Sequence, residues 1–127
     1  MRIAVFGGSG KAGRAVLSEA LARGHEVRAL VRTPAKLEFV HPRLDVVAGG
    51  FEDAAAVDRT LLGAEGAITS VGITSKERPT LLVDSVTAIR AGMHRAGVER
   101  LVIVQGVHIA FEGDPRNPGL LLLKAVL

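Results

Sequence analysis

The chain has 127 residues, of which 48% are hydrophobic and 23% charged, and its formal net charge is +3. This length and composition predict one soluble globular domain, because no apolar run approaches the roughly 20 residues that span a membrane. Nucleic-acid binding is typical of clustered basic residues among aromatic side chains, and aromatic residues make up only 3% of the sequence. The mild positive charge instead suits a small anionic ligand.

Cys and Tyr are both absent from the sequence, and each of these absences removes a class of chemistry. Without Cys, the chain has no disulfide, zinc–thiolate site or cysteine nucleophile, which fits a reducing compartment and predicts a cytoplasmic location. Without Tyr, no mechanism within these residues can use a tyrosine base. His25, His41 and His94 show no metal-ligand spacing, so no metal is expected. Met1 and Arg2 lead directly into the apolar run IAVFG, which is too short for the apolar region of a secretory signal, so no such signal is expected.

Short apolar segments alternate along the chain with segments of helical periodicity. The apolar segments are rich in Val and Ile and predict strands buried on both faces, at 2–7, 26–31, 44–49, 66–72 and 100–106. Apolar residues at spacings of three and four predict helices at 11–23, 53–62 and 80–96. Thr33-Pro34 predicts a short helix at 34–39. Because crossovers between parallel strands are right-handed, this alternation predicts a doubly wound parallel sheet of order 3-2-1-4-5.

The last segment, NPGLLLLKAVL at 117–127, predicts a helix that is apolar on all sides apart from Lys124. A helix of this kind is usually covered by more protein. Either the chain is the N-terminal portion of a longer domain, which we favour, or this helix pairs with a second copy in a homo-oligomer. A third hypothesis is that the 127 residues fold only within a dimer or a longer chain.

The segment FGGSGKAGRAV, residues 6–16, places four glycines between the first predicted strand and the first predicted helix. Its spacing is Gly8-x-Gly10-x-x-Gly13, preceded by Gly7, and is typical of a loop that binds the pyrophosphate of a dinucleotide. In such a loop Gly10 lets the backbone approach the pyrophosphate, and Gly13 lets the helix pack closely. A P-loop is excluded because the first glycine and the final Ser or Thr of that motif are missing.

The residue after the second predicted strand indicates whether such a site prefers NAD or NADP. NAD sites usually have an acidic residue about 20 residues beyond the glycine loop, where it binds the ribose hydroxyls. Arg32 stands at this position without an acidic neighbour, and Lys36 follows one helical turn later. Two cations suit the 2′-phosphate, so NADP(H) is the expected cofactor. NAD(H) is the alternative, because RTPAK also fits an ordinary exposed turn.

Together these segments resemble the atypical short-chain dehydrogenase/reductases with an NmrA-like NAD(P)-binding domain, and within that group the flavin reductase/biliverdin-IXβ reductase branch. The resemblance covers essentially the whole chain. It rests on the segments IAVFGGSGKAGRAV, GHEVRALVRTPAKL, VVAGGFEDAAAV, AITSVG and AGVERLVIV. Members of such families continue with further strands and a substrate-side subdomain, so the resemblance implies that residues 1–127 are a C-terminally truncated NAD(P)-binding domain.

The resemblance also implies a set of cofactor-binding residues. They are Gly7, Gly8, Ser9, Gly10, Lys11, Ala12, Gly13, Arg32, Lys36, Gly50, Phe51, Val71, Gly72 and Ile73. By similarity, residues 7–13 would hold the pyrophosphate, and Arg32 with Lys36 would contact the 2′-phosphate. Residues 50–51 would lie near the adenine, and 71–73 would run along the ribose and the nicotinamide.

The candidate catalytic residues are Gln105 and His108. Both follow the fifth predicted strand, at the edge where ligands bind to parallel sheets. Gln105 can hydrogen-bond the carboxamide or the substrate, with a structural role in the loop as the alternative. His108 can donate a proton to the alkoxide that forms when a carbonyl is reduced. A single loop histidine is, however, more often an ordinary surface residue.

The sequence departs from the resembled families at three places. Relatives usually have Asp after the glycine that ends the third strand, whereas here Gly49 is followed by a second glycine. Relatives usually end the fifth strand with Ser or Thr, whereas this strand ends in Val104-Gln105. The Tyr-x-x-x-Lys pair of the commoner short-chain enzymes is missing, because Leu120 stands four residues before Lys124.

These features predict an NAD(P)H-binding oxidoreductase that transfers hydride from NADPH to a small conjugated acceptor such as a flavin or quinone. Such an acceptor takes hydride with little acid catalysis from the protein, so the absence of Tyr is compatible with reductase activity. The alternative is a non-catalytic NAD(P)-sensing module of NmrA type, which the missing Tyr and the missing hydroxyl groups favour. A small-molecule substrate, and neither nucleic acid nor membrane, is the expected partner.

Overall fold

The computed structural model describes residues 1–72 and 80–104. The strands are β1 (Arg2–Phe6), β2 (Glu26–Val31), β3 (Leu44–Ala48), β4 (Gly66–Thr69) and β5 (Leu101–Ile103), and the helices are α1 (Lys11–Ala22), the 3₁₀ helix η1 (Pro34–Lys36), α2 (Ala54–Leu61) and α3 (Leu81–Ala96). Ile73, Gln105, His108 and the helix predicted at 117–127 lie outside the described residues. None of the helices in the described ranges combines the length and the apolar composition of a membrane span.

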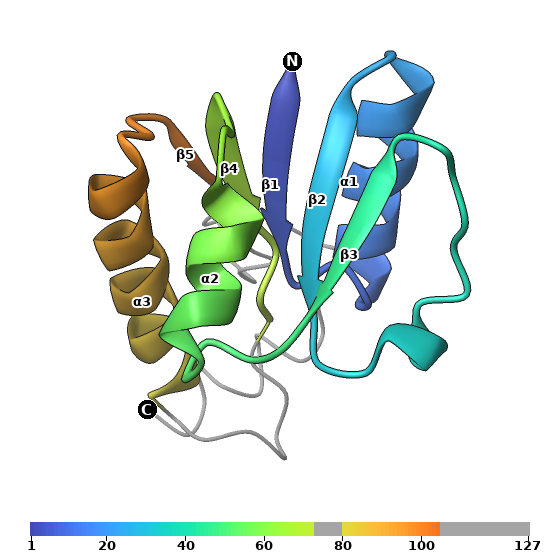
Figure 1. The fold of residues 1–127 in the computed structure, drawn as a ribbon. Coiled ribbons are helices and arrows are strands. Elements are labelled where there is room, and N and C mark those ends of the chain that lie inside the picture. The colour runs from blue at the N-terminus through green and yellow to red at the C-terminus, as the bar shows by residue number, and fades with distance from the viewer. Residues whose placement is uncertain (73–79, 105–127) are drawn as a thin grey trace, which may run out of the picture.

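The five strands form one parallel sheet in the order β3-β2-β1-β4-β5, which confirms the predicted order. In the central register Val5 of β1 pairs with Ala29 of β2 and with Ile68 of β4. Helices α2 and α3 cover one face of the sheet and α1 covers the other (Figure 1). The direction of the crossovers therefore reverses between β1 and β4, and the carboxyl ends of these two strands meet at one edge.

Apolar side chains form a core on each face of the sheet. Phe6 belongs to the core under α2 and α3, and its chain neighbour Val5 belongs to the core under α1; both are fully buried. Successive residues of a strand point to opposite faces, so a strand covered on both sides needs a continuous apolar run. This is why the central strand reads as IAVF in the sequence rather than as an alternation of apolar and polar residues.

The helix predicted at 34–39 is wrong in type and extent. The chain forms only the single 3₁₀ turn Pro34–Lys36, and Glu38 then adopts a left-handed conformation with φ 49°. Leu37 is buried in the core under α1 and draws the chain toward the sheet. A turn of this length has too few hydrogen bonds to extend into a helix on its own.

The other predicted elements match to within a few residues, with the largest differences at the ends of β4 and β5. The predicted strand 66–72 ends at Thr69, because the chain leaves the ladder where Val71 meets Gly7. At the end of α3, Gly97 has φ 70°, and the Val98 N–H donates to the Met93 carbonyl at 2.9 Å. This left-handed glycine closes the helix, as such glycines commonly do.

Asp53 caps α2, and its removal is a test of this part of the fold. The Ala56 N–H donates to the Asp53 carboxylate at 3.1 Å. We expect Asp53→Ala to lower the free energy of unfolding by about 1 kcal/mol, because a first-turn N–H loses its acceptor. Asp53→Asn keeps a side-chain oxygen there and should retain most of this stability in urea denaturation. Equal losses in the two variants would show that the cap does not stabilise the helix.

Candidate functional site

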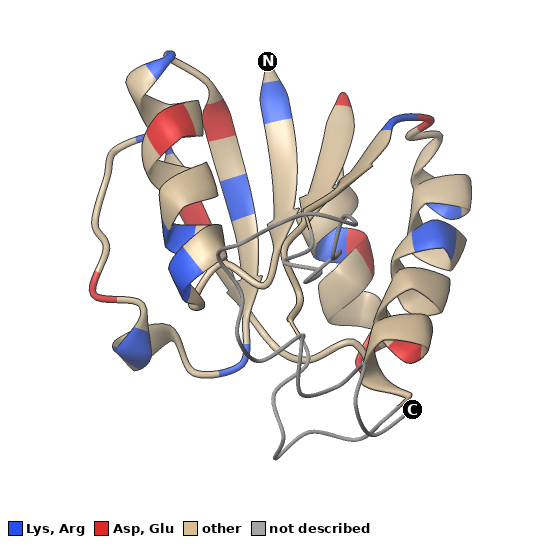
Figure 2. Ribbon diagram, turned by 180° about the vertical axis from the view of Figure 1, so that it is seen from behind, with Lys and Arg blue, Asp and Glu red and all other residues tan. Residues whose placement is uncertain are grey.

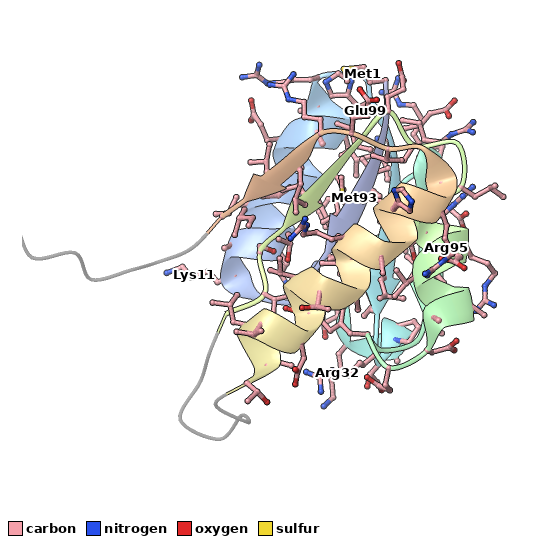
Figure 3. All side chains as sticks on the ribbon, turned by 90° about the vertical axis from the view of Figure 1, so that its left-hand side faces the viewer. Met1, Lys11, Arg32, Met93, Arg95 and Glu99 are labelled. Carbon is pink, nitrogen blue, oxygen red and sulfur yellow. The ribbon has the colours of Figure 1, made fainter. Side chains whose placement is uncertain are left out.

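A cavity of about 360 Å³ lies at the carboxyl ends of β1, β2 and β4. In doubly wound sheets, ligands bind at this edge, where the strand order reverses. Figure 3 shows Lys11 and Arg32 at this end of the molecule and Met1 and Glu99 at the opposite end. Five stretches of the chain line the cavity, within 7–12, 30–32, 49–51 and 70–72 and at Leu81. They are far apart in sequence, and the parallel topology brings them together.

The cavity collects most of the described residues that the sequence predicted for cofactor binding. Those that line it are Gly7, Ser9, Gly10, Lys11, Ala12, Arg32, Gly50, Phe51, Val71 and Gly72. Gly8 and Gly13 are buried behind the loop, and Lys36 is exposed on η1 without lining the cavity. The lining residues that sequence reasoning missed are Leu30, Val31, Gly49, Ser70 and Leu81.

The glycine loop is packed tightly against its surroundings. A Cβ at Gly13 would lie 2.7 Å from Gly8 Cα and 2.8 Å from Gly7 C, so only glycine lets α1 approach the loop this closely. Gly7 has φ 81°, and a Cβ there would lie 2.9 Å from Val71 N. At Gly10, by contrast, a Cβ would lie 3.8 Å from its nearest neighbour, Gly7 O, which is an ordinary van der Waals distance, so the fold itself leaves room at this position.

Ser70 attaches the glycine loop to the end of β4. Its hydroxyl donates to the Gly7 carbonyl at 3.1 Å and lies 3.3 Å from the Phe6 carbonyl. The Gly10 N–H makes a longer bond of 3.4 Å to the same Gly7 carbonyl. The sequence does show a hydroxyl residue directly after the strand that pairs with β1, and this pattern could have pointed to Ser70. Its role depends on strand register, which the sequence did not specify.

The N-terminus of α1 is open toward the cavity. Gly10 is its N-cap, no side chain caps it, and no acidic residue lies in its first turn. The first-turn N–H groups of a helix have no acceptor within the helix, and the helix dipole makes this end positive. In α2 the equivalent groups are served by Asp53. The α1 terminus is therefore suited to an anion supplied by a ligand.

The charged side chains that line the cavity are basic. Lys11 and Arg32 line it, and no Asp or Glu is among the lining residues in the described ranges. Figure 2 shows basic residues on the first turns of α1 and on the segment that follows β2. A ligand with more than one phosphate group could therefore contact a cation at the start of α1 and another after β2.

An aromatic surface lies at another part of the cavity. Phe51 lines it, and the Phe51 ring packs on the buried Phe6 ring with a centroid distance of 6.1 Å and an interplanar angle of 34°. Phe51 is half-buried, so one side of its ring is supported by the core. A planar heterocycle can stack or pack on such a surface.

A doubly wound parallel sheet with a glycine loop at its switch point defines a nucleotide-binding α/β domain. The chain belongs to the NAD(P)H-binding family whose model matches residues 7–125. This confirms the NAD(P)-binding resemblance found in the sequence. The family implies a nicotinamide cofactor, and the residues present fit one, because the uncapped helix terminus, the space at Gly10 and the basic lining all suit a dinucleotide.

Among curated proteins, the 3 beta-hydroxysteroid dehydrogenase/Delta 5-->4-isomerase of Mycobacterium tuberculosis is 32% identical over 125 residues, covering 89% of this chain and 34% of that protein. The chain thus spans about a third of the length of this relative. A uronate dehydrogenase variant from Agrobacterium tumefaciens, solved with NAD, is 25% identical with a TM-score of 0.66, covering 81% of this chain and 40% of that one. A Rossmann-fold NAD(P)-binding family protein from Shigella flexneri, 20% identical with a TM-score of 0.71, shares the fold over 98% of this chain and 60% of its own.

Proposed function

We propose that this chain binds NADPH in the cavity and is the cofactor-binding part of a reductase that delivers hydride to a small conjugated acceptor. The observation that supports NADPH over NADH is Arg32. It lines the same cavity as the glycine loop, at the end of β2, where an NAD site usually has a carboxylate. No carboxylate lines this cavity within the described residues.

In this proposal, different residues bind different parts of the dinucleotide. The pyrophosphate accepts hydrogen bonds from the α1 N-terminus in the space left by Gly10. The 2′-phosphate pairs with Arg32, and Lys36 adds a second positive charge from the neighbouring turn. The adenine packs near Gly50 and Phe51, and the nicotinamide end points toward the segment after β4.

The bound cofactor supplies the hydride, and the protein supplies orientation and exclusion of water. Val71 and Gly72 line the cavity beside the glycine loop, so a nicotinamide extending from the pyrophosphate passes along them. A flavin, quinone or similar acceptor delocalises the incoming electron pair and needs little acid catalysis. This choice of acceptor suits a chain whose 127 residues contain no Tyr.

The test is acceptor-dependent oxidation of NADPH by the purified protein. We expect turnover with at least one of a flavin, a quinone and an enone, and slower turnover with NADH. Gly10→Ala is the matched control, because it removes the space for the pyrophosphate and should abolish turnover without unfolding the chain. Tight NADPH binding without oxidation by any of the three acceptor classes would contradict the reductase proposal.

The second candidate is a non-catalytic module that senses the state of the NAD(P) pool. The absence of Tyr from residues 1–127 favours it, because none of these residues can serve as the tyrosine base of the commoner short-chain enzymes. A sensor of this kind would bind NADP⁺ or NADPH without turnover, and a protein partner would bind only one of the loaded forms. Acceptor-dependent NADPH oxidation would exclude this candidate.

A further inference from the structure

We propose that Arg14 is a positioning residue that determines how strongly this site prefers NADPH over NADH. It does so by holding the turn after β2, which contains Lys36 and follows Arg32, against the glycine loop. This inference rests on the proposed function, in which the turn binds the 2′-phosphate. Sequence reasoning gave Arg14 no role, because it lies outside the spacing of the glycine motif.

The evidence is a pair of hydrogen bonds from one guanidinium group. Arg14 Nε donates to the Ser9 carbonyl at 3.3 Å, and its terminal nitrogen donates to the Lys36 carbonyl at 2.8 Å. Ser9 is part of the glycine loop, and Lys36 is the last residue of η1. The guanidinium therefore joins the two segments that, in the proposed function, hold the pyrophosphate and the 2′-phosphate.

The turn depends on Arg14 more than the glycine loop does. The loop has its own supports, namely the Ser70 hydroxyl on Gly7 and the packing of Gly13. The turn is a three-residue 3₁₀ helix whose N-cap Thr33 makes no side-chain cap. Besides its internal bonds, the turn is held by contacts with β3, by the buried Leu37 that follows it and by the Arg14 hydrogen bond.

Two observations favour a positioning role for Arg14 over direct contact between Arg14 and the cofactor. Arg14 is exposed, and it is not among the residues that line the cavity, whereas Arg32 is. Its two bonds also use the fixed fork of the guanidinium, which spans two carbonyl groups at once. A lysine has the same charge, but its single ammonium group cannot reproduce this spanning geometry.

The experiment measures the dissociation constants of NADPH and NADH for Arg14→Ala and Arg14→Lys, with thermal unfolding as a check on the fold. We expect both variants to weaken NADPH about fivefold, the loss that one or two net hydrogen bonds produce, and NADH less than twofold. Arg23→Ala is the matched control. It removes a charge from the far end of the same helix, where Arg23 pairs with Glu19 at 2.6 Å, and should leave the ratio unchanged. Recovery of NADPH affinity in Arg14→Lys would overturn the inference, because charge alone would then be the cause.

A double variant separates this inference from the proposed function. If Arg14 acts by placing the turn, then adding Arg14→Ala to the Arg32→Ala variant should change the ratio of the NADPH and NADH dissociation constants only slightly. The same Arg14→Ala substitution in the wild type should change this ratio much more. Additive losses would mean that Arg14 does not act through the placement of Arg32, and would overturn the positioning role. If Arg32→Ala alone leaves the ratio unchanged, the NADPH assignment fails; if it changes the ratio and Arg14→Ala does not, only the present inference fails.

Discussion

Replacing Gly13 by alanine should lower both the stability of the domain and its affinity for any dinucleotide. The added methyl group would meet Gly8 Cα at 2.7 Å and Gly7 C at 2.8 Å, and both are backbone atoms. No side-chain rotamer can relieve such a contact, so α1 must move away from the loop. We expect a loss of about 2–3 kcal/mol in the free energy of unfolding, as for other overpacked sites.

The displacement of α1 should also weaken the binding of the cofactor. The α1 N-terminus and the loop together form the proposed pyrophosphate site, so moving one against the other misdirects the N–H groups. We expect at least about a tenfold loss of NADPH affinity, which corresponds to 1.4 kcal/mol. NADH should lose affinity to a similar extent, because the pyrophosphate is common to both cofactors. Denaturant unfolding and fluorescence titration measure the two effects on the same samples.

Gly10→Ala is the matched control for this prediction. Its φ of −74° suits any residue, and a Cβ would lie 3.8 Å from Gly7 O, so the fold should tolerate the substitution within about 1 kcal/mol. The methyl group would nevertheless occupy the space proposed for the pyrophosphate. Binding should therefore be lost without unfolding. Normal binding by Gly10→Ala would place the pyrophosphate elsewhere, and an unchanged unfolding midpoint in Gly13→Ala would refute the close packing of α1.

The sheet could be predicted from the sequence because its central strands are buried on both faces. Burial on both sides requires apolar runs such as IAVF, and the helices between them show apolar residues at helical spacing. The segment after β2 was predicted less well. Its conformation depends on the burial of Leu37 and on a carbonyl held by Arg14, and both are tertiary contacts that no local pattern encodes.

The candidate site, like the fold, could be predicted only in part from the sequence. The glycine spacing is local, so it could be read directly, and Arg32 could be placed because it follows a strand that the pattern identified. Ser70 and Arg14 were missed because their roles depend on which strands and turns are neighbours in space. The predicted Gln105 and His108 lie outside the described residues and stay predictions.

Arg32→Ala is expected to give the largest selective change in cofactor binding. The loss of a charge-assisted contact to the 2′-phosphate should weaken NADPH by about 1.5–3 kcal/mol, or about 10- to 150-fold. NADH has no such phosphate, so its affinity should change less than about twofold. Titration of both cofactors gives the ratio directly. Arg100→Ala, which removes an exposed charge just before β5 at the opposite edge of the sheet, controls for the net charge of the protein.

A charge-reversing substitution at the same position makes the test sharper. In Arg32→Asp a carboxylate would repel the 2′-phosphate and stand where NAD sites bind the ribose hydroxyls. NADPH should therefore bind more weakly than it does to Arg32→Ala, while NADH binds at least as tightly as to the wild type. The preference would then be inverted by one residue. If Arg32→Asp still prefers NADPH, the 2′-phosphate does not lie at the end of β2, and the assignment of NADP(H) to this cavity must be abandoned.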